Sequence, residues 1–146
     1  MRSRKEHPGF FGEYEVTVLG DGRIRLPRKA AVQLAEQGVV AVWLAFIPCG
    51  KGLVLCPESH WLTWVKQQQE RFPVLETLEG FRALLSPSQR AKLDRQGRIY
   101  VSTKLREAAK LSPGQPAVVV GVGEVFEIWA PDAFAEATAE YEQAFF

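Results

Sequence analysis

The chain has 146 residues, 47% of them hydrophobic and 24% charged, with a formal net charge of +1. That length fits one compact domain or two small ones, and the apolar content is too high for a chain that is mostly disordered. No apolar stretch approaches the roughly 18 residues that cross a bilayer, so we expect no membrane protein.

Residues 1–9 are basic and end at the turn-forming His7-Pro8-Gly9, with no apolar run behind them. This pattern predicts a flexible arm and argues against a signal peptide or a membrane anchor.

Residues 10–75 predict alternating strands and helices. Gly20-Asp21-Gly22 forms a tight turn between the first two strands, because glycine accepts a positive φ. Gly38 ends the first helix and Pro57 opens the second. The expected elements are strands over 13–18, 23–26, 39–47 and 53–56, with helices over 28–37 and 57–72.

Residues 76–90 form a mildly helical linker that ends at Ser86-Pro87-Ser88. Residues 91–146 then repeat the order of the first unit, with Gly121-Val122-Gly123 as a hairpin turn. Strands are expected over 91–94, 98–101, 117–121 and 125–129, with helices over 103–109 and 134–145.

The two units, residues 10–75 (the first half) and 91–146 (the second half), are a duplication. Gly22-Arg23-Ile24-Arg25-Leu26 returns 75 residues later as Gly97-Arg98-Ile99-Tyr100-Val101, and Lys29 returns as Lys104. Each half alone would have a marginal core, so we expect them to interleave. The predicted fold is α+β, mainly β with short helices, in one pseudo-twofold domain.

Each half ends in a helix with an aromatic stripe at helical spacing, and such stripes usually face a core. We expect each helix to cover its own half, although the exposed end of a stripe can instead contact another subunit. The stripes are Trp61, Val65, Gln68 and Phe72 in the first half and Phe134, Thr138, Tyr141 and Phe145 in the second.

Opposite charges are separated along the chain. Residues 90–110 hold seven cations and two acids, whereas residues 111–146 hold six acids and no lysine or arginine. This separation suits a protein that meets an anionic polymer on one side. Two solvated faces of opposite charge are the alternative.

Arginines follow both glycine turns. Arg23 and Arg25 alternate with apolar residues that face the core, so both point outward, and Arg98 and Tyr100 stand in the same register of the second half. A two-stranded ribbon fits the major groove of DNA, where arginine contacts phosphates or guanine. Singly, such arginines would be interpreted as merely solvated.

Several segments carry a family resemblance through their order and spacing. They are Phe11-Gly12, Gly22-Arg23-Ile24, Leu26-Pro27, Leu55-Cys56-Pro57, Trp61, Leu93-Asp94-Arg95-Gln96-Gly97-Arg98-Ile99, Leu105-Arg106, Val119-Val120-Gly121-Val122-Gly123 and Phe126-Glu127-Ile128-Trp129. Together they resemble the MraZ proteins of the AbrB-like family over about residues 10–145.

The family carries an Asp-x-x-x-Arg signature in each half. Asp94 and Arg98 match it, whereas Arg23 is preceded by Leu19 at the aspartate position. A carboxylate there can accept turn amides and hold the arginine. The residues expected to brace the turns are Asp94, Gly22 and Gly97.

The resemblance implies two AbrB-like swapped-hairpin halves, assembled into a homo-oligomeric ring. It also implies a cytoplasmic, nucleoid-associated regulator of the division and cell-wall gene cluster, including its own gene, that binds short direct repeats in double-stranded DNA. The expected leading DNA contacts are Arg23, Arg25 and Arg98, with Arg28, Lys29, Arg95 and Lys104 on the DNA backbone.

An oligomeric interaction module that has lost DNA binding is the alternative, motivated by Leu19 and the near-neutral charge. An enzyme is not expected, because no catalytic constellation, cofactor motif or metal-ligand set can be assembled. Cys49 and Cys56 lack the partners of a zinc site and are expected to be ordinary thiols.

Overall fold

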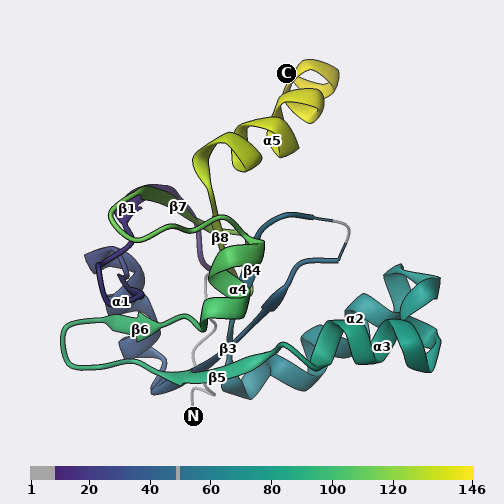
Figure 1. Ribbon diagram of the computed structural model, residues 1–146, viewed down its shortest axis with the longest axis horizontal. Coiled ribbons are helices and arrows are strands. Elements are labelled where there is room, and N and C mark those ends of the chain that lie inside the picture. The colour runs from purple at the N-terminus through teal and green to yellow at the C-terminus, as the bar shows by residue number, and fades with distance from the viewer. Residues whose placement is uncertain (1–8, 49) are drawn as a thin grey trace, which may run out of the picture.

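The computed structural model describes residues 9–48 and 50–146, so Cys49 and all of the predicted arm except Gly9 lie outside the described residues. The chain has the mixed α+β architecture expected from its sequence (Figure 1). Its elements are β1 (Glu13–Thr17), β2 (Arg23–Arg25), α1 (Arg28–Glu36), β3 (Ala41–Phe46), β4 (Leu53–Pro57), η1 (Glu58–His60), α2 (Trp61–Arg71), η2 (Pro73–Glu76), α3 (Leu78–Leu85), β5 (Gln89–Lys92), β6 (Arg98–Tyr100), α4 (Thr103–Ala108), β7 (Pro116–Gly121), β8 (Phe126–Trp129) and α5 (Pro131–Phe145).

The strands form two sheets that interleave the halves. A six-stranded sheet has the order β1-β7-β8-β4-β3-β5, and a two-stranded ribbon pairs β2 with β6. The first strand of each half pairs with a strand of the other half, β1 with β7 and β5 with β3, all antiparallel. Exchanging the corresponding strands of the halves leaves this order unchanged, as expected for a duplicated, swapped arrangement.

Backbone hydrogen bonds repeat the same exchange at single residues. The amide of Leu26 donates to the carbonyl of Gly97 at 2.9 Å, and the amide of Val101 donates to that of Gly22 at 3.3 Å. The two bonds differ by the 75-residue offset at both ends. The pseudo-twofold axis therefore passes through the ribbon, at the Ile24–Ile99 pair.

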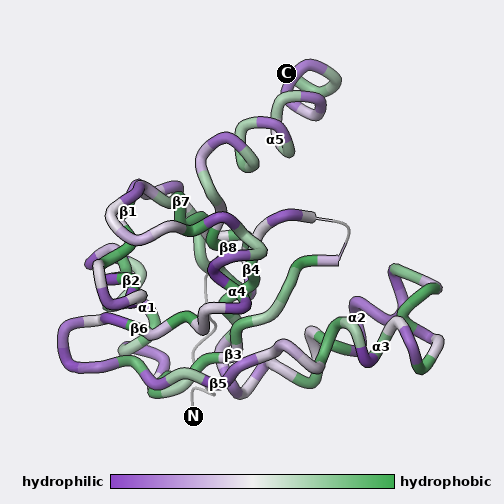
Figure 2. Tube along the Cα trace, in the orientation of Figure 1, coloured by the Kyte–Doolittle hydropathy of each residue, from purple (hydrophilic) through white to green (hydrophobic). Residues whose placement is uncertain are grey.

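One core lies between the ribbon and the large sheet. Ile24 and Ile99 are fully buried there, together with Leu44, Leu55 and Phe126 of the sheet. The central strands are accordingly hydrophobic, whereas the β5–β6 turn is hydrophilic (Figure 2). Packing against the sheet fixes which face of the ribbon points outward.

A second core covers the opposite face of the sheet. Val54 and Cys56 alternate with the residues of the first core along β4, and they face α2, η2 and α3. The Trp61 ring of α2 stacks on Trp43 with ring centroids 5.2 Å apart. The predicted stripe of this helix is thus core, with Gln68 only 6% exposed.

The corresponding prediction for the second half is wrong. Helix α5 leads away from the rest of the chain (Figure 1), and it has no buried residue. At the base of α5, Phe134 contacts Trp129, and the helix also contacts β7, whereas Tyr141 and Phe145 are 62% and 70% exposed. No further helix corresponding to α3 holds α5 against the sheet among the described residues.

Within the described part of the chain, no helix is both long and apolar enough to cross a membrane.

Candidate nucleic-acid interface

The ribbon gathers the predicted arginines on one face. Its register pairs Arg23 with Tyr100, Ile24 with Ile99, and Arg25 with Arg98. The two isoleucines are buried, so the side chains on either side of them along each strand lie on the outer face, as predicted from the alternation. Arginines that lie about 75 residues apart in sequence therefore meet on a single surface.

In the second half, Asp94 organises the turn that precedes Arg98. One carboxylate oxygen, Oδ1, accepts the amides of Gln96 at 2.9 Å and Arg98 at 2.8 Å. The other, Oδ2, accepts Nε of Arg98 at 2.7 Å. Asp94 thus fixes both the turn and the guanidinium, as the family signature implies.

In the first half, Asp21 takes this role. It accepts the amide of Arg23 at 3.0 Å and the Arg23 side chain, through NH1, at 2.6 Å. Leu19 makes the same backbone hydrogen bonds in the first turn as Asp94 makes in the second. Its amide donates to the carbonyl of Arg23, and its carbonyl accepts the amide of Gly22. The carboxylate has therefore moved two residues along the turn.

These hydrogen bonds also lower the pKa of both carboxyls. For Asp94 the backbone amide of Arg98 is the largest cause, and its side chain adds to it. For Asp21 the backbone amide of Arg23 likewise comes first. Both groups are therefore ionised at neutral pH, next to the arginines they hold.

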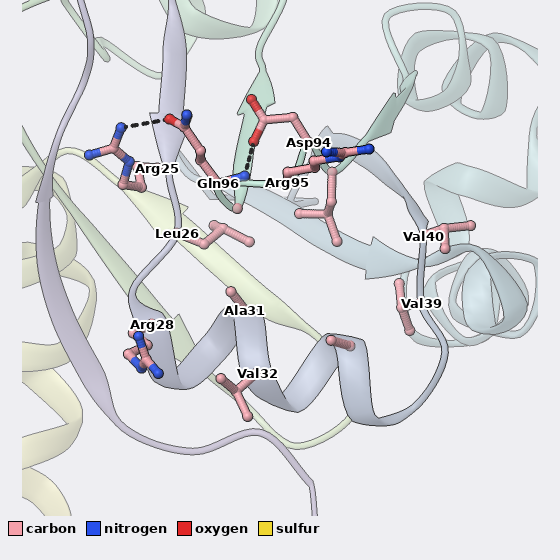
Figure 3. Close-up of a pocket in the computed structure, with 13 residues that line it drawn as sticks. Arg25, Leu26, Arg28, Ala31, Val32, Val39, Val40, Asp94, Arg95 and Gln96 are labelled. Carbon is pink, nitrogen blue, oxygen red and sulfur yellow. Dashed lines mark hydrogen bonds between the residues drawn. The ribbon is translucent and has the colours of Figure 1, made fainter.

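The remaining predicted cations lie around the ribbon. Arg28 and Lys29 are exposed in the first turn of α1, and Lys104 is exposed in the first turn of α4. Arg95 is exposed in the β5–β6 turn. Arg28 and Arg95 also line a cavity of about 620 Å³ beside α1, which we call the α1 pocket (Figure 3).

Gln96 and Arg106 are two further residues that the sequence reasoning did not assign to the site. Gln96 accepts a hydrogen bond from Arg25 at 3.3 Å. Arg106 donates from Nε to the carbonyl of Val101 at 2.8 Å and packs against Gly22. The 75-residue offset maps Arg106 onto Ala31, which packs against Gly97 in the structure, but an alanine at that position gives no sequence signal for an arginine at the site.

Tyr100 on the outer face is held by its neighbours in α4. The Arg106 guanidinium carbon lies 5.9 Å from the ring centroid. Hydrogen bonding with Thr103 first, and with Arg106 second, lowers the pKa of the phenol. Both outward-facing side chains of β6 are therefore held by neighbours, Arg98 by Asp94 and Tyr100 by Arg106.

Ser102 is the N-cap of α4, at the position where α1 has Pro27. Its hydroxyl accepts the amide of Leu105 at 3.3 Å, whereas Pro27 offers no such bond. Either residue starts a helix at the end of a ribbon strand, so both strands lead directly into a helix that begins near the site.

Among the described residues, no group of three or more His, Cys, Asp or Glu side chains is placed to hold a metal ion. His60 is partly buried and lies 3.5 Å from Glu124. Cys56 is buried, and its burial raises the pKa of the thiol to about 12, so it stays protonated.

Comparison with known proteins identifies the family. A family described as "MraZ protein, putative antitoxin-like" matches residues 84–146. A transcriptional regulator MraZ from Leuconostoc mesenteroides is 33% identical over 90% of this chain and 87% of its own length. Homologues of the same name from Roseiflexus and Desulfitobacterium hafniense are 39% and 31% identical over 84% and 93% of the chain, covering 81% and 91% of their own lengths. The chain belongs to the MraZ family.

The MraZ match from residue 84 onward contains the half with the complete Asp94–Arg98 pair. The first half, which departs from the family signature at Leu19, retains an ion pair on its arginine through Asp21. Both halves of this MraZ-family chain thus present an arginine with a bound carboxylate.

Proposed function

We propose that this chain is a sequence-specific DNA-binding transcriptional regulator that reads DNA with its β2–β6 ribbon. The observation that carries the proposal is the pairing of β2 with β6, which puts Arg23, Arg25 and Arg98 on one exposed face. A two-stranded ribbon fits the major groove, and arginine can bind guanine with two hydrogen bonds.

The electrostatics of the ribbon support an anionic partner. Arg25 and Arg98 are directly opposite each other across the strands, and like charges in that position are destabilising. Asp94 and Gln96 offset part of this repulsion by bonding to one arginine each. Phosphate groups bound at the ribbon would neutralise the remaining repulsion between the arginines. An anionic partner therefore explains the arrangement better than solvated arginines do.

The finer parts of the function follow from the family resemblance. The expected site is a set of short direct repeats upstream of the division and cell-wall gene cluster, including the chain's own gene, in the cytoplasm at the nucleoid. A homo-oligomeric ring would present many ribbons to such repeats and gain avidity without a strong single contact. Arg28, Lys29, Arg95 and Lys104 would contact the DNA backbone.

The test is binding of a duplex from the region upstream of the chain's gene, measured by fluorescence anisotropy. We expect Arg23→Ala with Arg98→Ala to abolish specific binding and to reduce the slope of log K against log salt by about 0.9 for each phosphate that the variant no longer neutralises. Arg71→Ala with Arg82→Ala, which removes two exposed cations from α2 and α3, is the matched control and should bind normally.

Unchanged binding by the ribbon variant would reject this assignment. An interaction module that has lost DNA binding would instead show no specific binding even in the wild-type chain. That alternative is motivated by the near-neutral charge and by the missing aspartate at position 19, and Asp21 supplies a carboxylate in place of the latter.

A further inference from the structure

A second cavity lies between α2 and the turn that joins β7 to β8, and we call it the α2 pocket. Its volume is about 450 Å³, which is within the usual range of ligand pockets. Trp64 and Val125, which belong to the second core, are part of its lining, so it lies on the face of the sheet away from the ribbon. None of the predicted DNA contacts lines it.

Gln68 in the wall of this pocket is the one polar side chain that is fully buried in the described part of the chain, with 6% of it exposed. Its Nε2 donates to the carbonyl of Trp64 at 3.3 Å. Among the described residues no buried side-chain oxygen or nitrogen lacks a partner, and none of these residues donates to Oε1 of Gln68. We therefore place Oε1 at the open side, where a hydrogen-bond donor in the pocket can reach it.

Glu127 gives the pocket a half-buried carboxyl group. One of its oxygens accepts the indole N–H of Trp129 at 2.9 Å. Burial raises the pKa of this carboxyl, and the hydrogen bond from Trp129 opposes that effect. Glu127 takes part in no ion pair with the described residues, so a cation that entered the pocket would be its first counterion.

The rim of the pocket carries a free cation. Arg71 is exposed, and its guanidinium carbon lies 5.8 Å from the centroid of the Phe72 ring. It has no carboxylate partner in the described chain, whereas Glu124 on the rim lies 3.5 Å from His60. The α2 pocket thus offers an unpaired carboxyl group within and an unpaired guanidinium at its edge.

We propose that the α2 pocket binds a small zwitterion of the amino-acid type. Its ammonium group would donate to Glu127 and to Oε1 of Gln68, and its carboxylate would bind Arg71. An apolar side chain on the ligand would lie against Trp64. The ammonium group is an organic cation, as the pocket requires, because the described residues supply no set of three or more metal-binding side chains.

This site goes beyond the proposed function, because it adds a small-molecule ligand to a chain that we propose to read DNA. The ligand and the DNA would occupy opposite faces of the large sheet. Both can therefore be bound at once, and each can be tested without the other.

The first experiment titrates the full isotope-labelled chain with three probes that share a phenyl ring and differ in charge. Phenylalanine has both charged groups, phenethylamine has the ammonium alone, and phenylpropionate has the carboxylate alone. For phenylalanine we expect a dissociation constant of about 1 mM, with NMR shifts at the Gln68 side-chain amide. Phenethylamine should bind about tenfold more weakly, the effect of losing one bond between charged groups, and phenylpropionate should bind most weakly.

Two variants assign the charged ends of the ligand. Glu127→Gln keeps an oxygen for the Trp129 indole, and it should weaken phenylalanine and phenethylamine by at least about tenfold but not phenylpropionate. Arg71→Ala should reduce the affinity for phenylalanine to that for phenethylamine and leave phenethylamine unchanged. Glu70→Gln, which changes an exposed acid of α2 outside the pocket, is the matched control and should bind all three probes normally.

Gln68→Leu separates a binding role from a structural one. An apolar side chain suits this buried position, so we expect an unchanged or higher melting temperature together with weaker binding of phenylalanine. Lower stability with full affinity would overturn the role given to Gln68.

The proposal as a whole is overturned if no probe shifts the signals of the α2 pocket, or if phenylpropionate binds as tightly as phenylalanine. Unchanged binding of phenylalanine by Glu127→Gln would also overturn it. None of these results bears on DNA binding, which the ribbon variants test separately.

Discussion

At the scale of single residues, two carboxylates set the geometry of the ribbon. Asp94 binds Arg98 through Nε, and Asp21 binds Arg23 through NH1. A guanidinium has five N–H donors, so each arginine retains donors that can bind another acceptor. An arginine held in place beforehand loses less side-chain entropy when it binds a partner.

The origin of the Asp94 pKa can be tested by titration. Because the backbone amide of Arg98 is the largest cause of its lowered pKa, Arg98→Ala should raise this pKa only in part. The carboxyl carbon of Asp94, followed by NMR against pH, measures this pKa directly. Return to the ordinary aspartate value in this variant would show that the side-chain ion pair is the main cause.

A pKa below the unfolded value also fixes the sign of a stability effect. The ionised Asp94 contributes stability above the unfolded pKa of an aspartate, and this contribution is lost as the pH falls through the lowered folded pKa. Asp94→Asn should therefore flatten the acid limb of the stability curve, which chemical denaturation at several pH values would measure.

The shift of the carboxylate from position 19 to position 21 leads to a rescue experiment. Asp21→Ala should increase hydrogen exchange at the Arg23 amide, because that amide loses its acceptor. Adding Leu19→Asp should restore protection, since position 19 has the backbone bonds of Asp94. No rescue would mean that the two turns differ in more than the position of the carboxylate.

At the scale of elements, each ribbon turn packs against a helix of the other half. Gly22 contacts Arg106 of α4, and Gly97 contacts Ala31 of α1. Both glycines have positive φ, 89° and 75°. The turns therefore need glycine twice over, for their backbone conformation and for close approach.

Substitution at Gly22 should be costly. Gly22→Ala places a methyl group 2.8 Å from the Arg106 guanidinium at positive φ, and we expect a loss of about 1–2 kcal/mol in the free energy of unfolding. Gly20→Ala, two residues away with open space around it, should change stability by less than about 0.5 kcal/mol. Urea denaturation of both variants gives the comparison, and equal effects would contradict this account.

The helices that end the two halves differ in what holds them. Helix α2 lies on the sheet because Trp61 stacks between Trp43 and Trp64, and η2 and α3 extend that core. Helix α5 meets the rest of the chain through the tilted contact between Phe134 and Trp129 and through contacts with β7, and it has no buried residue. The aromatic stripe of α2 is thus buried against the sheet, whereas the outer part of the similar stripe on α5 is exposed.

At the scale of the whole molecule, the exchange of strands makes the halves interdependent. Strand β1 completes its pairing on β7, and β5 completes its pairing on β3. Removing either half would expose unpaired strand edges as well as the core beneath the ribbon.

Separate fragments should therefore not fold as monomers. We expect residues 10–88 and 89–146, each expressed alone, to give poorly dispersed amide NMR spectra or to pair with themselves as dimers. Mixed, they should recover the spectrum of the whole chain. A dispersed spectrum from either fragment as a monomer would show that the halves are independent domains.

The sequence by itself predicted the order of most elements and the outward face of the arginines, because these depend on local periodicity and turn residues, and its 75-residue offset indicated a duplication. The domain boundaries and the DNA contacts drawn from it stay predictions. The tertiary structure decided that β2 pairs with β6, that Asp21 replaces the missing aspartate, and that α5 stands away from the body. These features depend on which residues far apart in sequence pack together. Helices α2 and α5 have the same spacing of apolar residues, so no local pattern in the sequence shows which of them packs against the sheet.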